Sequence, residues 1–289
     1  MPAPVVLITG CSSGIGLAAA VAAARSGWTT VATLRDTAKD GALREAADAA
    51  GVTLDIRALD VCDPGAVADV CDPGAVADVV AAVADDHGRL DALVNNAGRG
   101  TVGTAELLAE ADLRAAMEVN FFGVAAATRA ALPHLRATEG RVVTVTSVGG
   151  IVGQPFNEAY CAAKFAVEGY MESLAPVAAA VGVSVSVVEP GPVTTEFVAN
   201  AGVDLDALFG GAGPYLGAMQ AYLRHVTAHF LDGSAQTADE VAAVVLAALE
   251  DAEPAFRYLT SDWADAFTRP KLADRDGSAI QSVTRPWVS

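Results

Sequence analysis

Tyr160 and Lys164 are a pair of side chains whose types and spacing suit catalysis. They lie four positions apart in a segment that we expect to be helical, so both side chains share one face of the helix. An ammonium close to a phenol favours the phenolate and lowers the tyrosine pKa from its usual value of about 10. The pair therefore predicts a tyrosine that exchanges a proton with a substrate, although surface pairs without any catalytic role also have this spacing.

Two polar side chains upstream strengthen the catalytic interpretation. Ser147 ends a predicted buried strand before Tyr160, and Asn120 lies in the predicted helix that precedes this strand. The motif Asn95–Gly98 ends another strand, at the edge of a parallel sheet where ligands bind. Lys164 is also one of only three lysines in the chain, so chance is a poor explanation of its position. We therefore expect the side chains of four residues to act together, namely Asn120, Ser147, Tyr160 and Lys164.

A glycine-rich turn follows the first predicted strand and opens the first predicted helix. Gly10 permits the tight turn, Gly14 the close approach of the backbone to a pyrophosphate, and Gly16 the close packing of the helix on the strand. The unpaired N–H groups at the start of the helix then attract the phosphates. The expected cofactor contacts in this turn are Gly10, Ser12, Ser13, Gly14, Ile15 and Gly16.

The end of the second predicted strand favours one form of the dinucleotide. An acidic residue there binds the ribose hydroxyl of NAD, whereas an arginine accommodates the additional phosphate of NADP. Leu34 occupies the expected position of the acid and Arg35 follows it, which favours NADP(H). Ser12 offers a hydroxyl to the same phosphate. Asp36 keeps NAD(H) open as an alternative, because a shift of two positions would make it the ribose ligand.

The elements that must position these groups alternate between short apolar strands and longer helices, the pattern of a parallel sheet covered on both faces. The expected strands span residues 5–9, 29–33, 53–59, 92–95, 141–146, 184–188 and 256–259. The expected helices span residues 14–26, 38–50, 64–87, 105–136, 157–180 and 238–251. The sequence thus predicts an α/β fold with a Rossmann-type, doubly wound parallel sheet of about seven strands flanked by helices. We expect residues 1–289 to form a single domain, with a substrate lid at about 191–237 and a tail at 262–289.

Residues 61–69 and 70–78 repeat the same letters, VCDPGAVAD. A repeat of this length makes about 2.5 helical turns, so the two copies would face opposite sides of one continuous helix. Each copy also carries Asp-Pro-Gly, which breaks a helix interior and can start a new helix. We expect one copy to form an outward turn without function and the other to begin the helix.

The composition excludes several classes of protein. With 35 acidic against 18 basic side chains and a net charge of −17, the chain offers no general basic surface to a nucleic acid. A hydrophobic content of 53% is too high for a disordered chain. We expect no membrane span and no signal peptide, because the apolar runs are too short and the N-terminus lacks a basic start. The four cysteines lack metal-binding spacing, so we expect no metal and a reducing, cytoplasmic compartment.

Together these motifs resemble the short-chain dehydrogenase/reductase family over residues 5–260. The family pattern TGxxxGIG is matched at Thr9–Gly16, NNAG at Asn95–Gly98, and PGxVxT at Pro190–Thr195. The family's catalytic set of Asn, Ser, Tyr and Lys is matched at Asn120, Ser147, Tyr160 and Lys164. Other segments resemble the branch of 17β-hydroxysteroid and retinol dehydrogenases, namely Ile8–Leu17, Ala32–Asp36, Ser147–Gly150, Pro155–Asn157, Tyr160–Gly169 and Arg257–Thr260.

The resemblance implies an NADP(H)-dependent oxidoreductase that interconverts a hydrophobic alcohol and its ketone or aldehyde, such as a steroid, a retinol or a polyketide. It implies that Tyr160 exchanges a proton with the substrate oxygen while Ser147 hydrogen-bonds that oxygen. Lys164 would bind the nicotinamide ribose, and Asn120 would hold a water of the proton relay. The further cofactor contacts that it implies are Asp60, Val61, Asn96, Ala97, Gly98, Tyr160, Lys164, Pro190, Gly191, Val193 and Thr195.

The resemblance also bears on the repeat and on assembly. The interval between Asp60 and Asn95 exceeds the family's interval by the length of one repeat. The insertion therefore begins beside Asp60, the acid that the resemblance places at the edge of the cofactor's adenine. The family forms homodimers or homotetramers through helices that correspond to 105–136 and 157–180. The same assembly is expected of this chain.

The expected lid is rich in apolar and aromatic side chains, which favours a hydrophobic small-molecule substrate. Simple packing on the core is the alternative explanation of these side chains, which are Phe197, Leu205, Leu208, Phe209, Tyr215, Met219, Tyr222, Leu223 and Phe230. The candidate substrate contacts are Ser147, Gln154, Tyr160 and His225. A non-catalytic NADP(H)-sensing protein of the same fold is the alternative function, although a sensor would most easily lose the four catalytic residues. The spacing of the glycine turn argues against a nucleotide-sugar epimerase.

Overall fold

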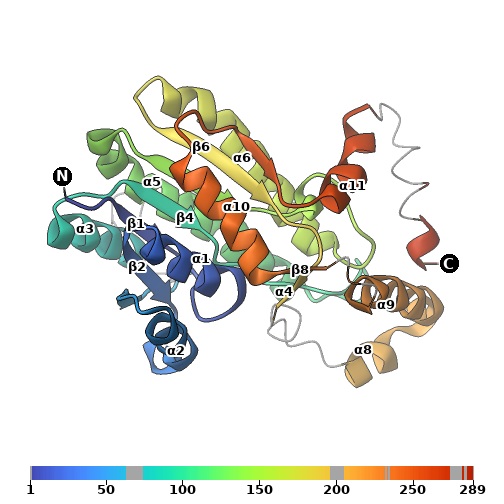
Figure 1. Cartoon of the computed structure of the whole chain (residues 1–289). Helices are drawn as coiled ribbons and strands as arrows, with labels where there is room; N and C mark the ends of the chain where they lie inside the picture. Colours follow the sequence, from blue (N-terminus) through green and yellow to red (C-terminus); the bar gives the residue numbers. More distant parts are fainter. Residues whose placement is uncertain are drawn as a thin grey trace.

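The computed structural model describes residues 2–62, 74–195, 205–231, 233, 235–273, 282 and 285–288. Its centre is a parallel seven-stranded sheet in the order β3-β2-β1-β4-β5-β6-β9 (Figure 1). The strands are β1 (Val5–Ile8), β2 (Thr29–Leu34), β3 (Asp55–Ala58), β4 (Ala92–Asn95), β5 (Arg141–Val145), β6 (Ser184–Glu189) and β9 (Arg257–Leu259). The strand order reverses between β1 and β4, where doubly wound sheets bind ligands beyond the carboxyl ends of their strands. The expected α/β fold is confirmed.

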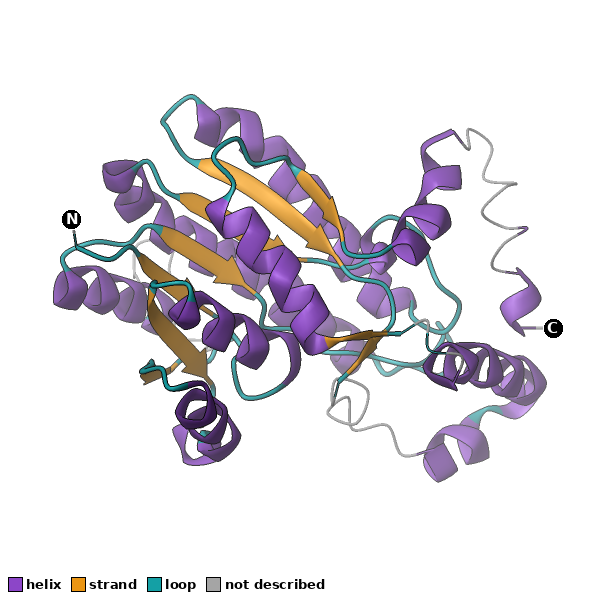
Figure 2. Ribbon diagram, in the orientation of Figure 1, coloured by secondary structure: helices purple, strands orange, loops and turns teal. Residues whose placement is uncertain are grey.

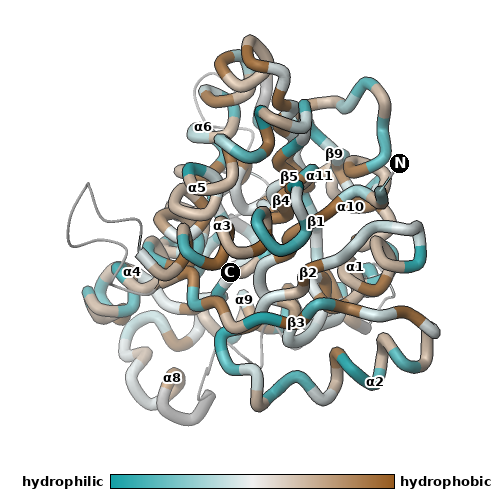
Figure 3. Tube along the Cα trace, turned by 90° about the vertical axis from the view of Figure 1, so that its left-hand side faces the viewer, coloured by the Kyte–Doolittle hydropathy of each residue, from teal (hydrophilic) through white to brown (hydrophobic). Residues whose placement is uncertain are grey.

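Helices cover both faces of the sheet, and Figure 3 shows the strands between the two helical layers. One layer contains α1, α2 and α10, and the other contains α3, α5 and α6. The strands bury apolar side chains on both faces, which explains their continuous apolar runs. The bounds of these helices are α1 Gly14–Arg25, α2 Gly41–Ala50, α3 Ala75–His87, α5 Gly123–Thr138, α6 Glu158–Ala179 and α10 Ala238–Glu250.

A third apolar cluster lies beyond the sheet, beside the loop that follows Ser147. It joins this loop to α8 (Leu205–Gly211) and α9 (Leu216–Leu231), which belong to the expected lid. The lid side chains Met219 and Tyr222 are buried in the cluster, so they pack on the protein itself. Figure 2 shows a small parallel pair of strands apart from the main sheet, formed by β7 (Val193–Thr194) and β8 (Gln236–Thr237).

The C-terminal region differs from the polar tail expected over 262–289. Its first part is a helix, α11 (Asp262–Ala273), whose Ala264 and Phe267 are buried in the third cluster. A short turn at Arg285–Val288 brings Trp287 into the same cluster. The charged residues between the apolar positions of α11 concealed its buried face in the sequence. The other short helical turns are Thr37–Lys39, Val148–Gly150 and Gly213–Tyr215.

The helix expected over 105–136 begins later, at Glu110, and runs to Thr138 with a π-helical segment inside it. The structure has α4 (Glu110–Met117), a π-helical segment (Glu118–Phe122) and then α5. A π turn accommodates one extra residue in the helix and often lies at a functional position. None of the helices in the described part of the chain is both long and apolar enough to cross a membrane.

The helix expected over 64–87 is described from Ala75 onward. Gly74 stands at its N-cap, so the helix begins inside the second copy of the nine-residue repeat, as one of the two copies was expected to do. Residues 63–73, which contain most of the first copy, lie outside the described residues. The outward turn expected of that copy therefore stays a prediction.

Candidate active site

Asn120 lies in the π-helical segment and is fully buried. Its amide donates hydrogen bonds to the carbonyls of Arg99 at 2.9 Å and Ala116 at 3.0 Å. Its Oδ1 accepts a hydrogen bond from the Arg99 N–H at 3.0 Å. A methyl group on the Cα of Gly98 would lie 3.1 Å from this oxygen and 3.9 Å from the Lys164 Nζ. Asn120 and Lys164 therefore flank the same short segment of backbone.

Ser147 and Tyr160 face each other just beyond the end of β5. The Ser147 Oγ accepts a hydrogen bond from the Gly149 N–H at 3.0 Å, which caps the turn Val148–Gly150. A hydrogen bond also joins the Ser147 and Tyr160 side chains. A methyl group on Gly149 would lie 3.2 Å from the Tyr160 ring and 3.4 Å from the Ser147 Oγ, so the bare backbone leaves room for both hydroxyls.

The environment of Tyr160 contradicts the expected lowering of its pKa. Burial raises the pKa of Tyr160 to about 12, and the hydrogen bond with Ser147 opposes this effect only in part. Burial also lowers the pKa of Lys164 to about 8, an effect that nearby Glu168 opposes. The Lys164 Nζ lies 5.8 Å from the centre of the Tyr160 ring and donates to the Val145 carbonyl at 3.0 Å. Desolvation is thus the largest effect on the pKa of Tyr160, and it favours the neutral phenol.

The glycine-rich turn packs against the segment that follows β4. A methyl group on Gly10, which has a φ of +73°, would lie 2.7 Å from the Ala97 Cα. A methyl group on Gly16 would overlap the Asn96 side chain. The Asn96 amide donates to the carbonyls of Thr9 at 2.9 Å and Gly10 at 3.0 Å. Asn96 therefore fixes the shape of the turn, a role that the sequence did not indicate.

The start of α1 fits the phosphates of a dinucleotide. The Ser13 side chain at the N-cap makes no capping hydrogen bond within the described residues, so it leaves the first N–H groups of α1 to a ligand. Gly14 has a φ of +57°, and a methyl group there would lie 3.3 Å from the Thr195 side chain. Ser12 is exposed, whereas Ile15 packs in part against the core beneath α1. These contacts bring the glycine turn and the 190–195 segment together.

The backbone of the 190–195 segment is held at several points. The Pro190 carbonyl accepts a hydrogen bond from the Val148 N–H at 3.0 Å, which ties the segment to the turn after Ser147. Val193 pairs with Gln236 in the small β7–β8 sheet. A methyl group on Gly191 would lie 2.8 Å from the Trp263 ring, so only glycine fits there without a shift. The segment thus lies between the expected catalytic and phosphate-binding residues.

Arg35 and Asp36 take different roles at the end of β2. Leu34 is buried as the last residue of the strand, and Arg35 is exposed directly after it. The Asp36 carboxylate accepts a hydrogen bond from the Ala38 N–H at 3.0 Å and caps the short turn that follows. The cap gives Asp36 a role within the turn, and Arg35 is exposed beside it.

Asp60 directly precedes the repeat, and Val61 is its first residue. The Asp60 carboxylate accepts a hydrogen bond from the Cys62 N–H at 3.0 Å, and the Val61 side chain packs against Gly123 at the start of α5. Burial raises the pKa of the Cys62 thiol to about 11. Among smaller effects, the charge of Asp60 raises this pKa and the charge of Arg35 lowers it. Asp60 and Arg35 therefore lie near the same sulfur.

The two remaining substrate candidates differ in their surroundings. The Gln154 N–H donates to the Cys161 Sγ at 3.4 Å, which holds the loop before Tyr160 against α6. His225 on α9 stacks on Trp287, with ring centres 4.4 Å apart. Burial and, to a smaller degree, His229 lower the pKa of His225. No spacing in the sequence predicted this aromatic stack, because its members come from separate parts of the chain.

Comparisons with known proteins agree with this arrangement. The short chain dehydrogenase family model matches residues 4–206. The chain is 40% identical to 17-beta-hydroxysteroid dehydrogenase type 1 of Mus musculus, over 96% of this chain and 80% of that protein. It is 39% identical to retinol dehydrogenase 8 of Bos taurus, over 94% and 86% of the two chains.

A solved structure of a variant of actinorhodin polyketide ketoreductase with NADPH matches with a TM-score of 0.68 and 29% identity. The match covers 91% of this chain and 92% of the ketoreductase. The fold, the matched family model and the two curated relatives agree with one another. The chain is therefore an oxidoreductase of the short-chain dehydrogenase family, in the branch of the 17β-hydroxysteroid and retinol dehydrogenases.

Proposed function

We propose that this protein is an NADP(H)-dependent oxidoreductase that interconverts a hydrophobic alcohol and its ketone or aldehyde, with Tyr160 as the general acid and base. The observation that carries the proposal is the hydrogen bond between Tyr160 and Ser147, close to buried Lys164. NAD(H) remains the alternative cofactor. The named relatives support a steroid, a retinol or a related apolar compound as the substrate class.

In the direction of reduction, Tyr160 donates its proton to the substrate oxygen. A phenol with a pKa of about 12 is fully protonated at neutral pH, so it is ready for this step. The Ser147 hydroxyl positions the same oxygen, which fixes the distance over which the proton moves. In the direction of oxidation, Tyr160 must first lose its proton, so this direction is favoured by high pH.

Lys164 and Asn120 prepare the site for the proton transfer. Lys164 binds the ribose next to the nicotinamide, and its charge supports the phenolate that forms once Tyr160 has given up its proton. Asn120 holds the backbone at Arg99 and orders a water between Lys164 and solvent. These roles are supported by the burial of both side chains on either side of Gly98.

The bound dinucleotide supplies the hydride, and this chain holds it along the carboxyl edge of the sheet. The start of α1 binds the pyrophosphate, and Arg35 with Ser12 binds the additional phosphate of NADP(H). Asp60 and Val61 line the adenine side. The backbone around the nicotinamide ribose is formed by Asn96, Ala97, Gly98, Pro190, Gly191, Val193 and Thr195. The exposed Arg35 and the capping role of Asp36 support NADP(H) over NAD(H).

The apolar cluster of α9, α11 and the loop after Ser147 supports a hydrophobic substrate. Such a substrate enters between this cluster and Tyr160, with its reacting oxygen at Ser147. We propose Gln154 as a polar contact near the reacting end and His225 as a contact at the distal end. Opening of the stack between His225 and Trp287 would accompany a contact at His225.

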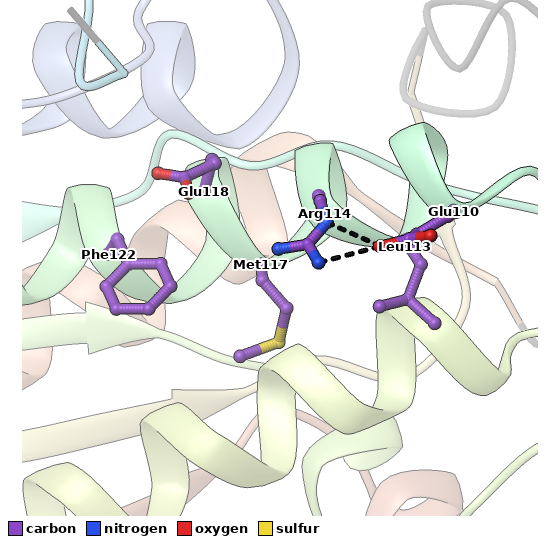
Figure 4. Close-up of a pocket in the computed structure, with 6 residues that line it drawn as sticks. All are labelled: Glu110, Leu113, Arg114, Met117, Glu118 and Phe122. Atoms are coloured by element: carbon purple, nitrogen blue, oxygen red, sulfur yellow. Dashed lines mark hydrogen bonds and ion pairs between the residues drawn. The ribbon is translucent and has the colours of Figure 1, made fainter. Parts of the chain in front are cut away.

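A homodimer or homotetramer is the assembly that the outer surface of α4 and of the π-helical segment supports. Leu113 and Phe122 are each 48% exposed there, and Phe165 of α6 is 39% exposed. The first two residues line a shallow pocket together with Glu110, Arg114, Met117 and Glu118 (Figure 4). None of these lining residues is a catalytic candidate, and apolar side chains of this size gain free energy when a second copy covers them.

A spectrophotometric screen tests the proposed function. The purified chain is mixed with NADPH and a set of apolar ketones and aldehydes that includes steroid ketones and retinal, and the loss of NADPH is followed. Tyr160→Phe is expected to lower kcat by at least about 100-fold, because the general acid is removed. Tyr170→Phe, on the same helix, serves as the matched control with near-normal rates. Activity that survives Tyr160→Phe would refute the acid role.

A further inference from the structure

A buried cluster of charged side chains lies behind the catalytic pair. Arg257, the first residue of β9, forms ion pairs with Glu168 at 2.6 Å, with Glu172 at 2.7 Å and with Glu189. Glu168 and Glu189 are almost entirely buried, whereas the side chain of Glu172 is 66% exposed. Three carboxylates thus share one guanidinium, and two of them are removed from water.

The two buried carboxylates carry more negative charge than the arginine balances. One oxygen of each, Glu168 Oε1 and Glu189 Oε2, has no hydrogen-bond partner among the described residues. Two like charges in a buried site disfavour each other's ionisation, so the pair takes up a proton more readily than two exposed carboxylates do. Burial and the charge of Glu168 raise the pKa of Glu189 to about 7, against the effect of Arg257. Glu189 is therefore the carboxylate of the pair that readily takes up a proton near neutral pH.

Glu168 is placed to act on the catalytic lysine. It follows Lys164 by one helical turn on α6, a spacing at which side chains are neighbours. A methyl group on Gly150 would lie 2.8 Å from the Glu168 Cγ and 3.1 Å from the Lys164 carbonyl. The turn that begins at Ser147 therefore rests on the helix between these two residues. Glu189 ends β6 and directly precedes Pro190, so the cluster also touches the strand that leads to the cofactor segment.

We propose that Glu168 is a positioning residue whose carboxylate supports the cationic form of Lys164, and that Glu189 takes up a proton at the other end of the buried cluster. The proposal rests on the role of Lys164 in the proposed function. The groups that face Glu168 are Lys164 and Glu172 on its own helix, Arg257 on β9 and Glu189 on β6. The turn Val148–Gly150 adds no titratable side chain. Tyr160 is the other titratable group beside Lys164.

The small number of lysines permits a direct test. The full chain is labelled with ¹³C-lysine, and the Cε signals of Lys39, Lys164 and Lys271 are followed by NMR from pH 6 to 11. Lys39→Arg and Lys271→Arg assign the signals. Glu168→Gln is expected to lower the titration midpoint of Lys164 by about one pH unit, since it removes the negative charge that acts on Lys164 from one helical turn away.

Two variants provide matched controls. Glu189→Gln imitates the protonated glutamate at equal burial and with the same Arg257 partner, and Glu172→Gln alters the exposed partner of that arginine. Both are expected to leave the Lys164 midpoint nearly unchanged. An unchanged midpoint in Glu168→Gln, or an equal shift in Glu168→Gln and Glu189→Gln, would overturn the proposal. If Glu168→Gln does not fold, Glu168→Asp replaces it. The expected result is then a smaller downward shift of the Lys164 midpoint, and an unchanged midpoint would overturn the proposal.

A second readout separates this proposal from the proposed function. The NMR titration needs no turnover, so a chain inactive toward every ketone would refute the function and still test Glu168. In an active enzyme, we expect the alkaline limb of the pH profile of kcat to move to lower pH in Glu168→Gln, by the same amount as the Lys164 midpoint. Glu168→Asp is expected to restore part of this shift. A profile that keeps its shape while only KM changes would overturn the positioning role.

Discussion

Gly16 and Asn96 occupy adjoining space between α1 and β4, so that a single added methyl group on Gly16 would overlap the asparagine amide. The same amide bonds the carbonyls of Thr9 and Gly10. The shape of the glycine turn is therefore held by the residue that follows β4, and we expect a change at Gly16 or Asn96 to alter that turn.

Gly16→Ala is expected to destabilise the fold by about 1–3 kcal/mol and to weaken dinucleotide binding, because the methyl group overpacks this contact. Gly169→Ala is the matched control, since it lies in α6 with open space around its Cα and gains helix propensity. Urea denaturation and titration with NADPH measure the two effects. Equal stability of the two variants would contradict the close packing.

Arg35→Gln is expected to reduce the affinity for NADPH about 10- to 100-fold, the range for a lost hydrogen bond to a charged group. The affinity for NADH should hardly change, because NADH lacks the additional phosphate. Lys39→Gln, an exposed cation in the next turn, controls for general charge. Binding curves for NADPH and NADH measure both affinities. An equal loss of affinity for NADH would contradict the assignment of Arg35 to the additional phosphate.

Glu189 makes the stability of the fold dependent on pH. Its pKa is raised from 4.5 to about 7, so the folded state binds a proton that the unfolded chain releases. This contribution is fully present below pH 4.5 and is lost as pH rises through 7, with a total of about 1–3 kcal/mol. Urea unfolding at pH 5 and pH 8 should show that loss in the parent chain and a smaller one in Glu189→Gln. The same loss in both would rule out Glu189 as its source.

Trp287→Ala is expected to cost about 3 kcal/mol, because the ring is buried and stacks on both His225 and Phe267. The loss should also raise the pKa of His225, which burial keeps low. Thermal unfolding and imidazole NMR signals report the two effects. Phe230→Ala on the exposed side of α9 is the comparison, and a Trp287 variant no less stable than it would contradict a packing role.

The sequence predicted those parts of the site that depend on consecutive residues. The glycine turn, Asn95–Gly98 and the spacing of Tyr160 and Lys164 are local, and a turn or helix places them without help from distant parts of the chain. The sheet followed equally from its apolar runs. The pKa of Tyr160 did not follow, because the burial that raises it arises from packing.

Long-range contacts explain the other differences. Arg257 meets Glu168 and Glu189 only after β9 has joined the sheet beside β6, and nothing in their spacing pairs them. The helix α11 was missed because its apolar positions are interrupted by charges. The π-helical segment within the helix expected over 105–136 was missed because a π turn leaves no mark on hydrophobic periodicity that a single sequence reveals.

That π turn separates two parts of one helix, the exposed side of α4 with Leu113 and the buried side with Asn120. Each residue of an α-helix turns the side chains by about 100°, so the inserted residue sets the rotation of α4 against α5. Deletion of one residue from Glu118–Phe122 would swing the exposed Leu113 around the helix axis while Asn120 kept its inward place, or the reverse. The exposed apolar face around Leu113 and the buried amide of Asn120 can therefore change independently, because the inserted residue sets their relative rotation.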